Sequence, residues 1–266
     1  MSFISTAPER FTYFDLQLGH PRWAGCKVLD FGGNKGALLS TARIEPRNYW
    51  CLDLSRDAIE QGKREYPQAH WIFYNRYNFA FNPRGIPGLP LPLDDEKFDF
   101  ILAYSVFTHT SRAEMLELVE VLGNRLVSNG TLAFTFIDPH CVLPEDYSPL
   151  LQGKTQRTNL RLRLEKMRAL SPGLSVDAML REAESAEWCT LVNGCDLYVD
   201  HEQIKAYSPE QKLAYDTFYS ARSMKRLFPE ATVAACPENY NPGGGQMQHC
   251  CILRKHSGGP MQTAIA

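Results

Sequence analysis

An acidic residue and three glycines stand close together in the run VLDFGGNKGALL at residues 28–39. Asp30 ends an apolar stretch, and glycines follow at positions 32, 33 and 36. Glycines allow a sharp turn and let a ligand approach backbone N–H groups closely. The spacing differs from the G-x-G-x-x-G pattern that holds a pyrophosphate. A carboxylate at this place suits a ligand with a cationic amino group, although Asp30 as a simple cap of the turn stays a second interpretation.

A second acid, Asp53, ends the next apolar run, YWCLD, 23 residues after Asp30. An acid at about this distance from a glycine turn is typical of sites that bind the ribose hydroxyls of a nucleoside cofactor. The other interpretation is an ordinary acidic residue before the helix expected at Arg56–Tyr66, where it would favour the helix dipole.

One titratable side chain ends the run FDFILAYSVFTH at residues 98–109. His109 has an unperturbed pKa near neutrality and could act as a general base. It could equally hold the turn by hydrogen bonding, and both roles stay open at this point.

Short apolar runs alternate with helical periodicities, and this alternation predicts βαβ units and a mostly parallel sheet. A ligand in such a sheet binds outside the carboxyl ends of the strands. The expected strands are Lys27–Phe31, Tyr49–Asp53, His70–Tyr74, Phe98–Tyr104 and Thr131–Ile137, and the expected helices are Gly36–Arg43, Arg56–Tyr66 and Arg112–Leu126.

The pattern divides the chain into five segments. Residues 1–25 are expected to be helical, 26–138 to form the core, 139–208 to form an inserted lid, 209–255 to complete the core, and 256–266 to be a disordered tail. Within the lid, Asn193–Gly194 between two β-prone runs, Trp188–Val192 and Cys195–Val199, predicts a hairpin. The last core segment is expected to form a helix, Pro209–Phe228, and two strands, Ala231–Ala235 and Gln248–Arg254.

Composition excludes several classes of protein. Apolar residues make up 44% and charged residues 22% of 266 residues, and the net charge of −2 predicts neither nucleic acid nor a membrane as a partner. We find no signal peptide and no apolar run of about 18 residues, so a cytoplasmic location is expected. The eight cysteines form no CxxC pair, which favours buried thiols and predicts no metal site.

The motifs together resemble those of class I, Rossmann-like S-adenosylmethionine (SAM) methyltransferases. VLDFGGNKG resembles motif I of that family, CLDLS its second motif, FDFILAYSVFTH its fourth-strand motif, and LVSNGTLAFTF the segment that ends in the fifth strand. The resemblance implies an α/β fold with a doubly wound, seven-stranded, mostly parallel sheet, one antiparallel terminal strand, and an inserted lid after strand five.

The resemblance also implies roles for individual residues. Asp30 and Gly32 would shape the methionine pocket, Asn34 replaces the usual middle glycine, and Gly36 would begin the helix. Asp53 would bind the ribose, Leu54 would lie beside the adenine, and Tyr104 would meet the methionine amino group through its backbone. Asn75 and Tyr77 fall where the family contacts the adenine edge.

The implied function is transfer of the SAM methyl group to an O or N atom of a small molecule, in the biosynthesis of bacterial secondary metabolites. Two alternatives stay open because a fold does not determine a reaction. One is a methyltransferase-fold enzyme that catalyses a cyclisation or elimination. The other is a non-catalytic partner subunit, and both a homo-oligomer and a heterodimer are compatible with the sequence.

Overall fold

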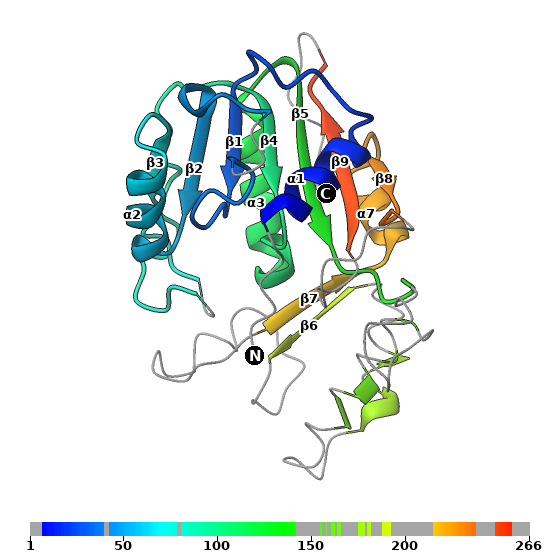
Figure 1. Cartoon of the computed structure of the whole chain (residues 1–266). Coiled ribbons are helices and arrows are strands. Elements are labelled where there is room, and N and C mark those ends of the chain that lie inside the picture. The colour runs from blue at the N-terminus through cyan, green and yellow to red at the C-terminus, as the bar shows by residue number, and fades with distance from the viewer. Residues whose placement is uncertain are drawn as a thin grey trace.

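A seven-stranded sheet forms the centre of the molecule, with strand order β3-β2-β1-β4-β5-β9-β8 (Figure 1). The computed structural model describes residues 7–39, 43–78, 81–141, 188–192, 215–237 and 248–256, with isolated residues between 155 and 181. The strands are β1 (Val28–Phe31), β2 (Tyr49–Asp53), β3 (His70–Phe73), β4 (Phe98–Ala103), β5 (Leu126–Phe136), β8 (Thr232–Ala234) and β9 (His249–Arg254).

Five of these strands, β1 to β5, pair in parallel, and β9 runs antiparallel to both β5 and β8. This arrangement confirms the predicted mostly parallel sheet with one antiparallel strand at the end of the chain. The strands are nearly continuous apolar runs because helices cover both faces of the sheet.

Two apolar layers enclose the sheet. Helices α1 (Ala7–Gln17) and α2 (Arg56–Glu65) pack on one face, and α3 (Arg112–Gly123) and α7 (Ala221–Leu227) pack on the other. Alternate residues of each strand supply the two layers, as the period of a β-strand requires. The carboxyl ends of β1, β2 and β4 therefore meet at one edge of the sheet, with α1 crossing nearby (Figure 1).

A second, two-stranded sheet lies beyond the carboxyl ends of β4 and β5 (Figure 1). Its strands are β6 (Trp188–Val192) and β7 (Tyr215–Tyr219), which pair antiparallel. The strand predicted at 188–192 is therefore confirmed, and it pairs with β7. The run Cys195–Val199, predicted as its hairpin partner, falls outside the described residues together with most of the expected lid.

Two predicted helices are wrong in part. The predicted helix Pro209–Phe228 contains strand β7, and only Ala221–Leu227 is helical among its described residues. The aromatic and β-branched side chains of YDTFY favour a strand, and pairing with β6 satisfies its backbone. The predicted helix Gly36–Arg43 is not an α-helix over its described residues 36–39. The backbone hydrogen bonds there join residues three apart in some places and four apart in others, as in a series of turns.

Gly36 has a positive φ of 88°, and a Cβ built on it would lie 2.7 Å from Cη2 of Trp71. We therefore expect Gly36→Ala to lower the free energy of unfolding by about 2–5 kcal/mol, the sum of a left-handed backbone and an overlap. Gly25→Ala is the matched control, because Gly25 has a φ of 81° but nothing within 4 Å of the added carbon. It should cost only about 1–2 kcal/mol. Urea unfolding measures both, and equal losses would contradict the proposed contact with Trp71.

Candidate functional site

The turn after β1 is held tightly against the end of β2 and the segment after β4. Gly32 has a φ of 76°, and its N–H donates to the carbonyl of Leu52 over 2.8 Å. A Cβ on Gly32 would lie 2.4 Å from Cγ2 of Val106. Only glycine combines this backbone with so close an approach, so the turn depends on the residue that the motif predicted.

Asp53 fastens the turn to β2 through its carboxylate. Its Oδ2 accepts a hydrogen bond from the backbone N–H of Asn34 over 2.7 Å, and its Oδ1 accepts one from that of Ser55 over 2.7 Å. Burial raises the pKa of Asp53, and these two N–H donors oppose the rise. Asn34 has a φ of 55°, a conformation that asparagine tolerates, so the missing middle glycine is accommodated.

Asp30 lies beneath the same turn and is 3% exposed. Its Oδ2 accepts a hydrogen bond from the hydroxyl of Tyr49 over 2.6 Å. Burial raises its pKa to about 6, the charge of Asp53 adds to the rise, and the Tyr49 hydroxyl and the Arg10 guanidinium oppose it. At neutral pH the site therefore carries a negative charge that the protein has removed from water.

A buried polar network holds the end of β4. Ser105 has a φ of 56°, and its N–H donates to Oγ1 of Thr135 over 2.7 Å. Thr135 donates to Oε1 of Gln248, whose Nε2 donates to Oγ of Ser105 over 3.0 Å. The hydroxyl of Tyr13 in α1 donates to the carbonyl of Gln248. The network fixes the backbone that follows Tyr104, the residue predicted to meet an amino group.

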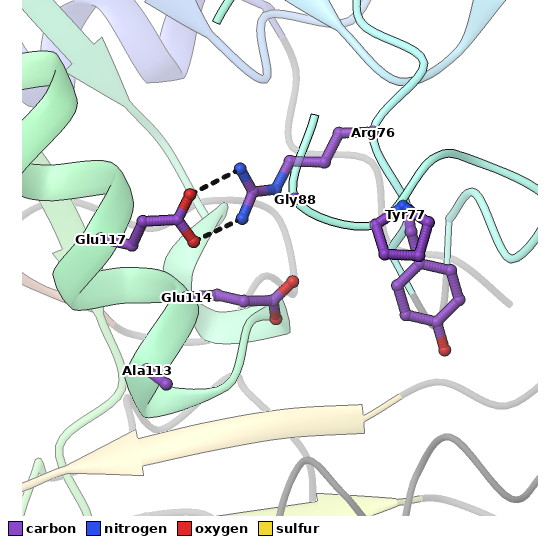
Figure 2. A pocket seen from close by; sticks show the side chains of 7 residues that line it. Arg76, Tyr77, Gly88, Ala113, Glu114 and Glu117 are labelled. Carbon is purple, nitrogen blue, oxygen red and sulfur yellow. Dashed lines mark hydrogen bonds and ion pairs between the residues drawn. The ribbon is translucent and has the colours of Figure 1, made fainter. Parts of the chain in front are cut away.

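The loop after β3 is braced by one ion pair. Arg76 donates two hydrogen bonds to the carboxylate of Glu117 in α3, over 2.6 and 2.9 Å (Figure 2). Asn75 accepts a hydrogen bond from the side chain of Asn82 within the loop. Tyr77 lies beside a hollow of about 400 Å³, which is lined by Arg76, Tyr77, Pro87, Gly88, Ala113, Glu114 and Glu117. The hollow does not include the glycine turn, so we assign it no part in the site.

His109 ends the short 3-10 helix η3 (Phe107–His109). Its carbonyl accepts a hydrogen bond from Nδ2 of Asn78 over 2.9 Å, and its ring meets that of Phe81 with centroids 5.0 Å apart. These contacts join the segment after β4 to the loop after β3. They support the bracing role that the sequence left open beside general base catalysis.

The structure brings together most of the residues predicted to bind a cofactor. Asp30, Gly32, Asn34, Gly36 and Asp53 form the connected turn, and Leu54 follows it directly, partly buried against the core. Tyr104 lies at the end of the neighbouring strand, and Asn75 follows β3. Tyr77 differs, because its side chain lines the separate hollow.

Three residues near the turn were not predicted from the sequence. Arg10 lies over the ring of Tyr104, with Cζ 5.4 Å from the ring centroid, while Val106 covers Gly32 and Gln248 organises the network at β4. A signal for Arg10 was present in the sequence. Arg10 precedes the buried Tyr13 and Phe14 by three and four residues, and this spacing puts all three on one helix face. No comparable signal in the sequence points to Gln248.

Other features of the described residues bear on the predicted class of site. The six cysteines whose side chains the structure describes are free, and five of them are buried, as predicted. No group of three His, Cys, Asp or Glu side chains in this part of the chain is arranged to hold a metal ion. None of its helices has the length and apolar character that crossing a membrane requires.

Comparison with known proteins finds a family match within the core. Residues 29–132 match the family model described as a methyltransferase domain. A SAM-dependent methyltransferase from Clostridium acetobutylicum shares the fold with a TM-score of 0.51 at 9% identity, over 94% of this chain and 92% of that one. The glycopeptide N-methyltransferase MtfA in complex with SAM gives 0.51 at 10% identity, over 96% and 88%. No curated protein sequence matches the chain.

These matches confirm the fold that the motifs implied: the chain has the class I methyltransferase fold, and its residues 29–132 are similar to the methyltransferase domain family. At identities of 9% and 10%, the similarity to these structures shows a common fold and nothing more. The substrates of those proteins are therefore properties of those proteins.

The buried charge of Asp30 should cost stability, and Asp30→Asn should recover it. A carboxyl group whose pKa is about 6 in the folded chain and about 3.9 when unfolded is protonated in both states at about pH 3. As the pH rises through this window the unfolded chain ionises first, so folding loses up to about 3 kcal/mol. Asp30→Asn should therefore raise the free energy of unfolding by up to about 3 kcal/mol at about pH 7.5 and change it little at about pH 4.

Asp95→Asn is the control for this measurement, since the side chain of Asp95 is fully exposed. It should change the free energy of unfolding in urea equally at both pH values. An Asp30→Asn variant that behaves like the control would show that burial does not perturb the Asp30 carboxyl.

Proposed function

Taking residues 29–132 as a methyltransferase domain of the class I fold, we propose that the chain transfers the methyl group of SAM to an O or N atom of a small molecule. The observation that carries the proposal is the turn after β1, fastened by Asp53 and lying over the buried charge of Asp30. It stands at the carboxyl ends of the strands, where ligands of open α/β sheets bind.

The residues of this turn suit SAM chemically. The carboxylate of Asp53 accepts two N–H bonds on separate oxygens, and each oxygen keeps a lone pair that can accept a ribose hydroxyl. Leu54 provides an apolar surface beside it for the adenine, and Asn75 offers an amide for the adenine edge. When bound, SAM supplies a methyl group activated by a sulfonium.

The charge of Asp30 supports a cationic ligand in particular. A negative charge held in a low dielectric attracts a nearby cation more strongly than one in water. The ammonium and sulfonium of SAM both carry positive charge, and the backbone after Tyr104 is held rigid by the network around Thr135 and Gln248. These residues would orient the cofactor and exclude water, which are the main requirements of a displacement at a methyl group.

The acceptor is proposed to bind between the cofactor and the β6–β7 pair. Thr217 of β7 donates a hydrogen bond from Oγ1 to the carbonyl of Thr110 over 2.7 Å, and Phe218 bridges to Ile137 after β5. The pair is thus attached next to η3, at the same edge of the sheet as the turn. A small-molecule acceptor, a role in bacterial secondary metabolism and a cytoplasmic location stay predictions.

Calorimetry with SAM and S-adenosylhomocysteine tests the proposal first, followed by transfer of a labelled methyl group to a panel of small alcohols, phenols and amines. Binding of both ligands and appearance of labelled product would support a methyltransferase. Binding without transfer to any acceptor would favour the cyclisation or elimination chemistry left open by the sequence. Binding of neither ligand would contradict the proposed function and favour a partner subunit.

Asp53→Ala should weaken binding of S-adenosylhomocysteine by about 1.5–3 kcal/mol, the range for hydrogen bonds to a charged group. The substitution removes the ribose acceptor and the bond that holds Asn34. Asp57→Ala is the matched control, because this exposed acid lies close by in the chain, in the first turn of α2. Calorimetry should find that Asp57→Ala binds S-adenosylhomocysteine as tightly as the wild type. If the folded Asp53→Ala variant also bound it as tightly as the wild type, the ribose assignment would be wrong.

His109→Ala should keep most of its methyl-transfer activity and lose about 1–2 kcal/mol of stability, because the contact with Phe81 braces the turn. His256→Ala, at an exposed position, controls for the loss of a histidine. Turnover and melting temperature are measured on one preparation. A general base would give the opposite result, with turnover reduced by roughly 10²–10⁴-fold at unchanged melting temperature.

A further inference from the structure

Arg10 places a cation inside the apolar contact between α1 and the end of β4. It lies on the same face of α1 as Tyr13 and Phe14, which are completely buried. The rings of both residues meet that of Tyr104 edge to face, with centroids 5.5 and 6.2 Å apart. The guanidinium of Arg10 lies over the same Tyr104 ring, with Cζ 5.4 Å from its centroid.

One donor of this guanidinium is buried without a partner: Nε of Arg10 makes no hydrogen bond to any residue that the structure describes. An unsatisfied buried donor loses its hydration without compensation, and the loss is larger for a charged group, so native proteins rarely retain one. A cation–π contact with Tyr104 recovers only part of this cost at a partly exposed position. Arg10 as a whole is only half-buried, so a ligand that brings an acceptor can reach its side chain.

The position of Arg10 indicates what that acceptor would be. It contacts the ring of Tyr104, which directly follows β4, and its positive charge opposes the rise in the pKa of both Asp30 and Asp53. It therefore lies near the carboxyl ends of the strands that form the proposed site. In the proposed site, Asp30 attracts the ammonium of the ligand and Asp53 binds its ribose. A zwitterionic amino acid also carries a carboxylate, and a planar guanidinium is the side chain that best matches it.

We propose that Arg10 binds the α-carboxylate of the methionyl group of SAM, and that α1 is in this way part of the cofactor site. This inference rests on the proposed function. Arg10 is a binding residue for the amino-acid end of the ligand only, because the nucleoside end is held by Asp53 and Leu54.

A purely structural role for Arg10 makes a different prediction. If the guanidinium only packs on Tyr104, its removal should affect every ligand of the site alike. If it only offsets the charge of Asp30, its removal should strengthen the binding of a ligand that carries an ammonium. A ligand pair that shares the nucleoside but differs in the amino acid separates the two roles. S-adenosylhomocysteine carries the amino acid, and 5′-methylthioadenosine lacks it.

The experiment measures the affinity of both ligands for the full chain by calorimetry, with the wild type, Arg10→Met and Arg10→Lys. Arg10→Met keeps much of the apolar stem of the side chain and removes the charge. It should weaken S-adenosylhomocysteine by about tenfold or more, the loss of hydrogen bonds to a charged group. The affinity of Arg10→Met for methylthioadenosine should change less than about twofold. The affinity of Arg10→Lys for S-adenosylhomocysteine should lie between those of the wild type and Arg10→Met.

Arg43→Met is the matched control, since Arg43 is exposed and its guanidinium approaches Asp15. It should leave both affinities unchanged. An equal loss of both ligands in Arg10→Met, or no loss of S-adenosylhomocysteine, would overturn the role of Arg10 while leaving the proposed function intact. Failure of the wild type to bind either ligand would overturn the proposed function and this inference with it.

Discussion

The hydrogen bond from the backbone of Asn34 to the carboxylate of Asp53 is the constraint on which the rest of the site depends. It ties the turn after β1 to the end of β2, and the bond from Gly32 to Leu52 repeats the connection one step earlier. With the turn fixed there, Gly32 meets Val106 and Gly36 meets Trp71. Segments that are distant in the sequence thereby share one surface at the carboxyl edge of the sheet.

Charge is distributed across this surface at a cost to stability. Burial raises the pKa of Asp30 and of Asp53, and the Arg10 guanidinium opposes both shifts without forming a hydrogen bond at Nε to any described residue. A fold selected only for stability would avoid a buried carboxyl, a second partly buried carboxyl and an unpaired donor in the same region. Their retention together is what a site for a ligand with charges of both signs requires, because the ligand supplies the missing partners.

The strands and the turn could be predicted from the sequence because both have local causes. Apolar runs that end in glycine or an acid predicted β1, β2 and β4 to within one residue, and the spacing of Asp30 and Asp53 predicted that they would meet. Helix α2 was also predicted closely, since Ser55 caps it through its hydroxyl and Asp57 follows in its first turn. These features depend on neighbours in the chain.

The errors fall where distant segments decide the structure. The run Tyr215–Tyr219 has a spacing that a helix tolerates, and only pairing with β6 makes it a strand. Strand β7 is separated from β6 by a long connection, and closing a long connection costs little more entropy than closing a short one, so the sequence contains no local signal for this pairing. Arg10 and Gln248 could not be assigned from composition, because their roles come from α1 and the segment before β9 meeting the end of β4.

The central claim is that the ligand binds at the turn between β1 and β2, and amide chemical-shift mapping tests it directly. In a titration of isotope-labelled protein with S-adenosylhomocysteine, the largest changes should occur at Gly32–Gly36, at Asp53–Ser55 and at Tyr104–Val106, with a change at Arg10. The loop around Gly88, beside the separate hollow, should change little. Changes confined to that hollow, or no changes at saturating ligand, would contradict the account.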